Sequence, residues 1–317
     1  MHTLFLLSAL LLAAVVGGIG AFLLRVAPAG GRRPLALTVL AAPPSVLGLA
    51  ALHIVPRFWT ACAPLVGWDL VTTVGLLLAM GSVALGGLGL NLARLLLSER
   101  LLAACPPLRD AATTAGLAAL ARRLGIDPPR LRVLAIDAPL AVTGGLRRPT
   151  IVLSRWLVEQ LDRRELEAVL AHELAHVARR DHLARWLGRL LRDATVYLPS
   201  SWYAWRVLEA DEELEADALA VELTERPLAM ASALGKVWQQ ASAGPLAIAS
   251  LPSYAGPSAL LLEQRLARLL EGRAHRTPAF PGRLLAGGMA LTVAGLTPRL
   301  LAAGVALFPL MCSLRPL

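Results

Sequence analysis

The chain has 317 residues, of which 56% are hydrophobic and 17% are charged, and its net charge is +9. A soluble domain carries about 25% charged residues. The apolar excess excludes a disordered or collagen-like chain and disfavours a soluble enzyme. Two classes remain: an oily basic protein that binds nucleic acid, or a membrane protein with a separate polar domain.

Three apolar stretches precede the polar part of the chain, at about residues 3–24, 34–55 and 70–90. Each is long enough to cross a hydrocarbon layer of about 30 Å as a helix. A cleaved signal peptide is the alternative for the first stretch. Its apolar core is longer than the roughly 7–15 residues of such a peptide, and further spans follow it. We therefore predict three transmembrane helices within residues 1–97.

A fourth apolar stretch lies in residues 284–317 and is interrupted by Pro298 and Arg299. We predict one tilted transmembrane helix in which the Arg299 side chain reaches toward the membrane surface. A span followed by a tail that lies in the interface is the alternative.

Basic residues in the short loops predict the orientation of these spans. The first loop contains Arg25, Arg32 and Arg33, whereas the second contains only Arg57. Since basic loops stay on the cytoplasmic side, we expect the first loop and the polar part of the chain to be cytoplasmic in the cell membrane.

Residues 98–283 hold most of the charged residues and form a polar domain large enough for its own core. They contain no zinc-finger spacing and no basic stripe with interleaved aromatic residues, so we expect no nucleic-acid partner. The cysteines Cys62, Cys105 and Cys312 are scattered and form no CxxC pair, so no cysteine zinc site is expected.

The segment LDRRELEAVLAHELAHVARR predicts a helix that carries a metal site. Asp162 and Glu165 form a capping box at its start. Within the helix, His172 and His176 lie one turn apart on one face and can hold one Zn²⁺ ion. Glu173 lies beside them as the general base that takes a proton from water. A chance match is the alternative, but burying these groups without a partner would be costly.

The acidic helix of residues 201–223 supplies the candidate third ligand. Glu213 and Asp217 lie on one face, so one carboxylate can bind the metal while the other orients a histidine ring. We assign Glu213 as the ligand and Asp217 as the partner of His172, with Glu209 as a competing ligand. Most other acidic residues of this helix are expected to form a solvated face.

Together, the motifs HELAHVARRDH, YLPSSWYAW and EELEADALAV after a multi-span N-terminus resemble the integral-membrane zinc peptidases of the BlaR/MecR type. The resemblance extends over most of residues 131–272. It implies a mainly α-helical membrane protein with four transmembrane helices and an α+β gluzincin peptidase domain between the third and fourth. It also implies metal binding by His172, His176 and Glu213, with Glu173 as base and Asp217 as support.

The chain differs from each of the best-known types of this clan and shares one feature with HtpX. The related HtpX and CAAX prenyl protease type inserts membrane helices between the metal motifs, whereas residues 183–205 are studded with arginines. The Glu-Ala-Asp sequence is closer to HtpX. We also expect no penicillin-binding sensor domain, so no direct antibiotic-sensing role is predicted.

Residues 131–137 and 141–154 alternate apolar and polar side chains around Gly144 and Gly145, which predicts a strand pair or hairpin. One of these strands is a candidate edge for binding the substrate backbone; a purely structural hairpin is the alternative. Four side chains are candidates for stabilising the oxyanion of the reaction, although His182 fits a structural role at a helix end better: His182, Tyr203, Arg206 and His275.

The predicted function is a membrane-embedded zinc metalloendopeptidase that hydrolyses a protein substrate near the cytoplasmic membrane face, in regulatory proteolysis or signalling. An HtpX- or CAAX-type quality-control or processing peptidase is one alternative. A non-catalytic membrane scaffold that retains the fold is the other. The expected partners are a protein or peptide substrate and the lipid bilayer.

Overall fold

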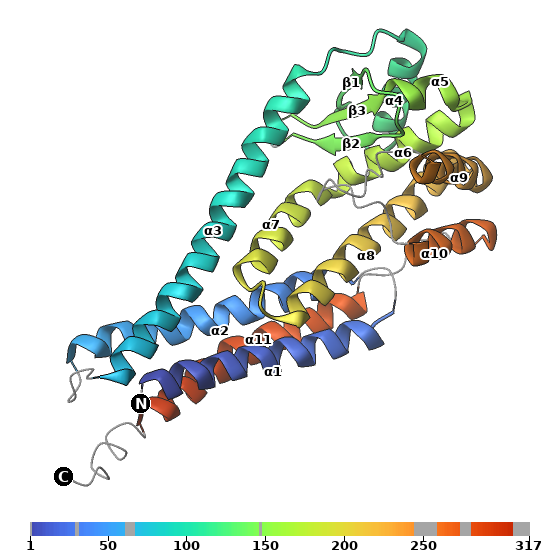
Figure 1. The fold of residues 1–317 in the computed structure, drawn as a ribbon. Coiled ribbons are helices and arrows are strands. Elements are labelled where there is room, and N and C mark those ends of the chain that lie inside the picture. The colour runs from blue at the N-terminus through green and yellow to red at the C-terminus, as the bar shows by residue number, and fades with distance from the viewer. Residues whose placement is uncertain are drawn as a thin grey trace, which may run out of the picture. The chain divides into compact units, whose positions relative to one another are not determined.

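The computed structural model describes residues 2–28, 32–60, 67–145, 148–243, 259–272 and 280–306, and this part of the chain is mostly helical with one small sheet (Figure 1). Contacts divide the chain into two compact units. The helical unit comprises Met1–Leu92, Leu187–Leu208 and Ala279–Leu317, and the sheet unit comprises Ala93–Trp186 and Glu209–Pro278. The domain limits expected from the sequence stay a prediction.

The helical unit begins with α1 (His2–Val26), α2 (Arg33–Thr60) and α3 (Trp68–Ala104). Among the described residues, three helices are long and apolar enough to cross a membrane, and these are the three. Helix α3 runs past its predicted end at residue 90. The reason is that residues 91–104 are mostly helix formers, and the first helix breakers are Pro106 and Pro107.

Helix α11 (Phe280–Ala306) covers most of the fourth apolar stretch and contains Pro298. In the described part of the chain α11 is not among the helices that qualify as candidate spans. The fourth transmembrane helix therefore stays a prediction, and residues 307–317 lie outside the described residues.

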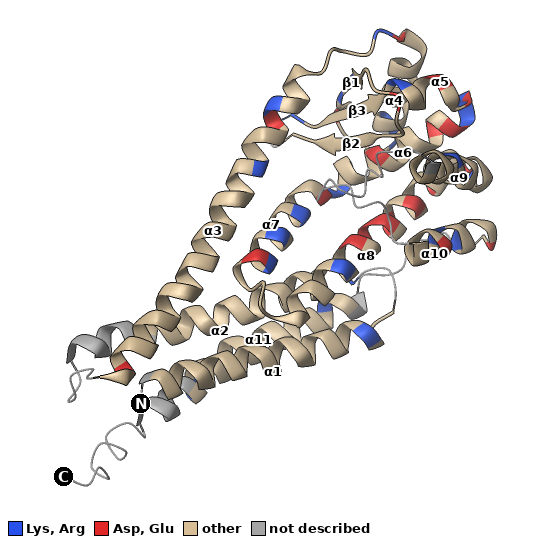
Figure 2. Ribbon diagram, in the orientation of Figure 1, with Lys and Arg blue, Asp and Glu red and all other residues tan. Residues whose placement is uncertain are grey.

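Helices α1, α2 and α11 pack closely around small residues. A Cβ atom added to Gly20 of α1 would lie 2.6 Å from Val39 of α2 and 2.8 Å from Met289 of α11, so only glycine allows this approach. Figure 2 shows that α1 and α2 carry hardly any charged residues, whereas α6, α8 and α10 carry many.

The remaining helices are α4 (Ala111–Arg123), α5 (Arg155–Gln160), α6 (Arg163–Arg179), α7 (Asp181–Ala194), α8 (Pro199–Thr224), α9 (Pro227–Ala243) and α10 (Ala259–Leu270). Helices α3, α7 and α8 each have residues in both units, and α3 passes from the helical unit to the sheet unit after Leu92.

The sheet has three strands in the order β1-β3-β2: β1 (Arg130–Leu134), β2 (Ala141–Gly144) and β3 (Thr150–Ser154). Strands β2 and β3 pair antiparallel, which confirms the predicted hairpin, and β1 pairs with β3 in parallel. Gly145 turns the chain with φ of +100°, a conformation that favours glycine. Strand β3 is buried throughout, and β2 lies at one edge of the sheet.

Helix α6 is the central helix of the sheet unit. It packs against β2, α4 and α9, and residues 168–177 are continuously buried. Asp162 accepts hydrogen bonds from the backbone N–H groups of Arg164 and Glu165, and the Glu165 carboxylate accepts one from the Asp162 N–H. This confirms the predicted capping box. The helix ends at Arg180, whose φ of +53° lies in the left-handed region.

Candidate metal centre

Helix α6 carries two histidines and a glutamate in the interior of the sheet unit. His172, Glu173 and His176 are only 7%, 7% and 5% exposed. The two imidazole rings project from successive turns, and their Nε2 atoms are 3.2 Å apart. Apolar residues at the helical repeat, among them Leu170 and Leu174, bury the other side of α6 and hold the rings in place.

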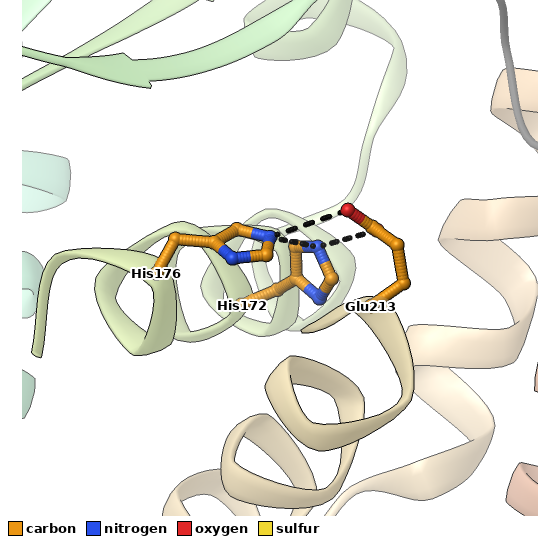
Figure 3. Close-up of side chains that lie close together, drawn as sticks. All are labelled: His172, His176 and Glu213. Carbon is orange, nitrogen blue, oxygen red and sulfur yellow. Dashed lines mark hydrogen bonds and ion pairs between the residues drawn. The ribbon is translucent and has the colours of Figure 1, made fainter. Parts of the chain in front are cut away.

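Glu213 of α8 completes the cluster, and its carboxylate points toward both rings (Figure 3). Glu213 Oε2 lies 3.4 Å from His172 Nε2, and Oε1 lies 3.6 Å from His176 Nε2. Two ligand atoms at about 2.0–2.1 Å from a tetrahedral zinc ion are about 3.4 Å apart. The spacing of these three side chains therefore fits three ligands of one tetrahedral ion.

Each histidine has a carboxylate next to its other ring nitrogen. Asp217 Oδ1 lies 2.9 Å from His172 Nδ1, and Asp181 Oδ2 lies 2.8 Å from His176 Nδ1. A proton on Nδ1 facing a carboxylate leaves the Nε2 lone pair of each ring for a metal. The sequence reasoning missed Asp181, which follows the left-handed turn at Arg180.

Two arginines lie next to the carboxylate of Glu213, and the sequence analysis did not predict either of them. Arg265 of α10 contacts both Asp217 oxygens at 2.7 Å and lies 3.0 Å from Glu213 Oε2. Arg185 of α7 lies 2.6 Å from Glu213 Oε1. These cations stabilise the ionised form of the Asp217 and Glu213 carboxylates.

The pKa values in the site follow from this arrangement. Burial alone would lower the pKa of His172, but Asp217 and Glu213 raise it to about 9. Burial and Arg185 lower the pKa of His176. Arg265 and His172 hold the pKa of Glu213 well below its usual range, although burial opposes this. The two carboxylates thus stabilise a positive charge on the His172 ring.

The general-base candidate is held from the edge of the sheet. The hydroxyl of Thr143 on β2 donates a hydrogen bond of 2.6 Å to Glu173 Oε2. The same hydroxyl lies 3.3 Å from the backbone carbonyl oxygen of Glu173. Strand β2 therefore orients the carboxylate that we expected to act on water.

The prediction that most other acidic residues of α8 form a solvated face is wrong. Asp211, Glu212 and Glu215 are buried. Glu212 pairs with Arg185 at 2.7 Å, and Glu215 pairs with Arg179 at 3.2 Å. Basic residues of α6 and α7 lie against this face, so burial does not leave the carboxylates unpaired.

The competing metal ligand Glu209 is not part of the metal cluster, and the oxyanion candidates that the structure describes are spread over both units of the chain. Within the described residues, the metal cluster contains Glu213 and not Glu209. Tyr203 and Arg206 belong to the helical unit, whereas His182 belongs to the sheet unit and is half-buried. His275, like Cys62 and Cys312, lies outside the described residues.

Three long apolar helices and a buried two-histidine, one-carboxylate cluster together define a membrane protein of the metallopeptidase class. The model of the BlaR1 peptidase M56 family matches residues 62–233, which is more than half of the chain. The chain belongs to this family.

Curated relatives carry the HtpX name. A protease HtpX homolog of Halobacterium salinarum is 42% identical over 71 residues, covering 22% of this chain and 25% of the relative. Homologs from Bacteroides fragilis and Acidiphilium cryptum are each 30% identical over 156 residues, covering 36% and 38% of this chain and 48% and 54% of the relatives. The chain thus spans about a quarter to a half of the length of the curated relatives it matches.

Proposed function

We propose that this chain is a membrane-embedded zinc metalloendopeptidase that hydrolyses peptide bonds of a protein substrate close to the membrane, in regulatory proteolysis or signalling. The observation that carries the proposal is the cluster of His172, His176 and Glu213. Its ligand atoms are 3.2–3.6 Å apart, and Glu173 is the next residue on the same helix.

In this proposal His172, His176 and Glu213 hold the ion, while Asp217 and Asp181 orient the rings. A zinc ion at this position supplies Lewis acidity toward water and the scissile carbonyl. Glu173 accepts the proton of the attacking water and then donates it to the leaving amine. Thr143 keeps the Glu173 carboxylate in one orientation during both transfers.

The membrane setting is part of the same proposal. We place four transmembrane helices in the chain, with residues 98–283 as the peptidase domain between the third and fourth. The basic first loop favours a cytoplasmic peptidase domain. An edge strand such as β2 suits an extended substrate segment, because its outer backbone groups are available for pairing.

A quality-control or processing peptidase of the HtpX or CAAX type is the second candidate. The names of the curated relatives favour it at least as well as the BlaR/MecR type. Cleavage of a prenylated peptide in preference to an unfolded protein would identify a CAAX-type activity. Cleavage of misfolded membrane proteins in preference to one regulator would identify the HtpX type.

The test uses the full chain in liposomes, with unfolded casein as the probe and zinc content measured on the same samples. We expect one zinc ion per chain in the wild type, little in His176→Ala and Glu213→Gln, and normal content in Glu209→Gln. Glu173→Gln should keep the zinc but lose activity by about 10²–10⁴-fold.

Each contrary result is informative. A wild type that binds no zinc would remove the basis for the mechanism. Equal cleavage by the wild type and Glu173→Gln would contradict the assigned base. A wild type that holds zinc and cleaves neither casein nor itself would favour the non-catalytic scaffold.

A further inference from the structure

The end of α7 and the beginning of α8 form a helical hairpin whose turn is residues 195–198. Residues Leu187–Leu208 belong to the helical unit, together with α1, α2 and α11. At the turn, Leu198 is only 6% exposed and packs with Ala13 of α1 and Val46 of α2. Next to it, Ser200 lies directly against Gly17 of α1, where a Cβ atom would not fit.

These contacts give the depth of the hairpin relative to the candidate spans. Ala13 lies near the middle of the span Thr3–Val26, about 15–20 Å from either end at 1.5 Å per residue. Further along the hairpin, Trp205 and Leu208 belong to one apolar cluster with Leu24, near the C-terminal end of α1, and Leu35, near the N-terminal end of α2. The hairpin therefore runs along the spans, and its turn lies at the depth of their middle.

Several polar groups of the hairpin are paired within the helical unit. Asp193 accepts hydrogen bonds from Arg192 at 2.6 Å and from Asn91 of α3 at 2.8 Å. The hydroxyls of Thr195 and Ser201 bond to each other at 2.8 Å. Such pairing is required of polar groups in hydrocarbon, where water is absent.

The arginines also lie on aromatic rings. The Arg192 guanidinium is 4.6 Å from the Trp202 ring centroid, and that of Arg189 is 5.5 Å from the Trp205 ring centroid. A cation over an indole face is stabilised without water. Arg189 and Arg192, which make this segment look water-exposed in the sequence, are therefore compatible with membrane insertion.

The outer face of the hairpin consists of the side chains that are exposed in the chain by itself. Five of them are large and apolar or aromatic: Leu187, Val196, Tyr197, Trp202 and Tyr203. Pro199 at the turn and Arg206 near the end of the hairpin are exposed as well. We propose that residues 187–208 form a re-entrant membrane hairpin and that lipid acyl chains cover this face. The candidate spans α1 and α3 of the same chain also expose large apolar side chains, as a surface covered by the bilayer does.

This inference does not depend on peptidase activity. The helix that carries Glu213 then begins inside the bilayer, since α8 starts at Pro199 within the hairpin. This membrane element is not among the candidate spans of the described residues, and α7, with 14 residues, is too short to cross a bilayer.

The experiment compares the labelling rates of single cysteines that have similar exposed fractions. The purified protein is in liposomes that are permeabilised, so that the reagent reaches both sides of the membrane. The native residues Cys62, Cys105 and Cys312 are first replaced by serine or alanine. Val196→Cys reports on the hairpin, where Val196 is 40% exposed, and Glu167→Cys is the control on α6, where the Glu167 side chain is 38% exposed. The probe is a charged maleimide, with labelling rates normalised to protein unfolded in detergent.

We expect Val196→Cys to react about tenfold or more slowly than Glu167→Cys, because hydrocarbon raises the pKa of a thiol and excludes the charged reagent. Equal normalised rates would overturn the proposal. Slow labelling in native membranes but fast labelling in the purified proteoliposomes would also overturn it, since a protein and not lipid would then cover the face. A repeat at Tyr203→Cys guards against one variant that folds poorly.

Discussion

The sheet unit and the helical unit differ in whether they bury charged side chains. In the described residues, every buried charged side chain lies in the sheet unit, where Glu165, Glu173, Asp217 and Arg265 are examples. The buried polar groups of the helical unit are uncharged, such as Asn91 and Thr195. At the same time α1 and α3 expose many large apolar side chains. One unit thus folds around ionic contacts that form a site, whereas the other depends on an apolar surrounding.

Removing one cation from the buried network should produce the largest effect. Arg265→Ala removes the guanidinium that contacts both oxygens of the buried Asp217 and leaves Glu213 with Arg185 alone, and the free energy of unfolding should fall by about 3–5 kcal/mol. Guanidinium unfolding of solubilised protein, with a chelator present to remove metal, measures this. Arg268→Ala on the same helix is the control and should change little. A similar loss of stability in both variants would show that the ion pairs of Arg265 are not the cause.

A second ionic contact in the sheet unit should depend on pH. Burial would raise the pKa of Glu165, but Lys236 and Ser232 lower it below the ordinary value. Glu165→Gln should therefore cost about 1.5–3 kcal/mol at pH 7, where the ionised carboxylate accepts these bonds.

Because the folded-state pKa of Glu165 is lowered, its contribution is present above the unfolded-state pKa and is lost as pH falls through the folded value. The gap between wild type and Glu165→Gln should close below about pH 4. Unfolding curves between pH 7 and pH 3 test this, with the exposed Glu167→Gln as control. A gap that stays constant with pH would contradict the ionic explanation.

The hydrogen bond to the proposed base should affect catalysis and not metal binding. Thr143→Val keeps the shape of the side chain but removes the donor to Glu173, and kcat on casein should fall about tenfold with KM unchanged. Thr143→Ser retains a hydroxyl and should restore most of the activity, while all three proteins bind zinc equally. A loss of activity that serine does not rescue would indicate a packing role.

The smallest effect is expected in the helical unit. Asn91→Ala removes a buried hydrogen bond to Asp193, yet such bonds between membrane helices contribute only about 0.6 kcal/mol. Thermal unfolding in detergent should show a small shift compared with Arg265→Ala. An effect as large as that of Arg265→Ala would mean that Asp193 depends on Asn91 for its charge, and the contrast between the two units would disappear.

The local features of the fold could be predicted from the sequence. The capping box of Asp162 and Glu165, the hairpin at Gly145 and the first three apolar helices follow from short-range patterns. The grouping of His172 and His176 also follows from one turn of helix.

The long-range features could not be predicted in this way. Arg265 is 48 residues from Asp217 in the chain, and nothing near either residue signals the pair. The burial of Glu212 depends on Arg185 from a different helix. Acidic residues on a helix resemble a solvated face unless their distant partners are known. For the same reason, the arginines of residues 187–208 concealed a segment that packs on apolar helices.

The left-handed residue at the end of α6 has a consequence for the order of folding. Because Arg180 turns the chain sharply, His176 meets Asp181 across only five positions, whereas Glu213 and Asp217 must arrive from more than thirty residues away. Contacts of short sequence separation form with little loss of chain entropy. One half of the metal centre can therefore assemble while the chain is still being synthesised, and the other half must wait for α8.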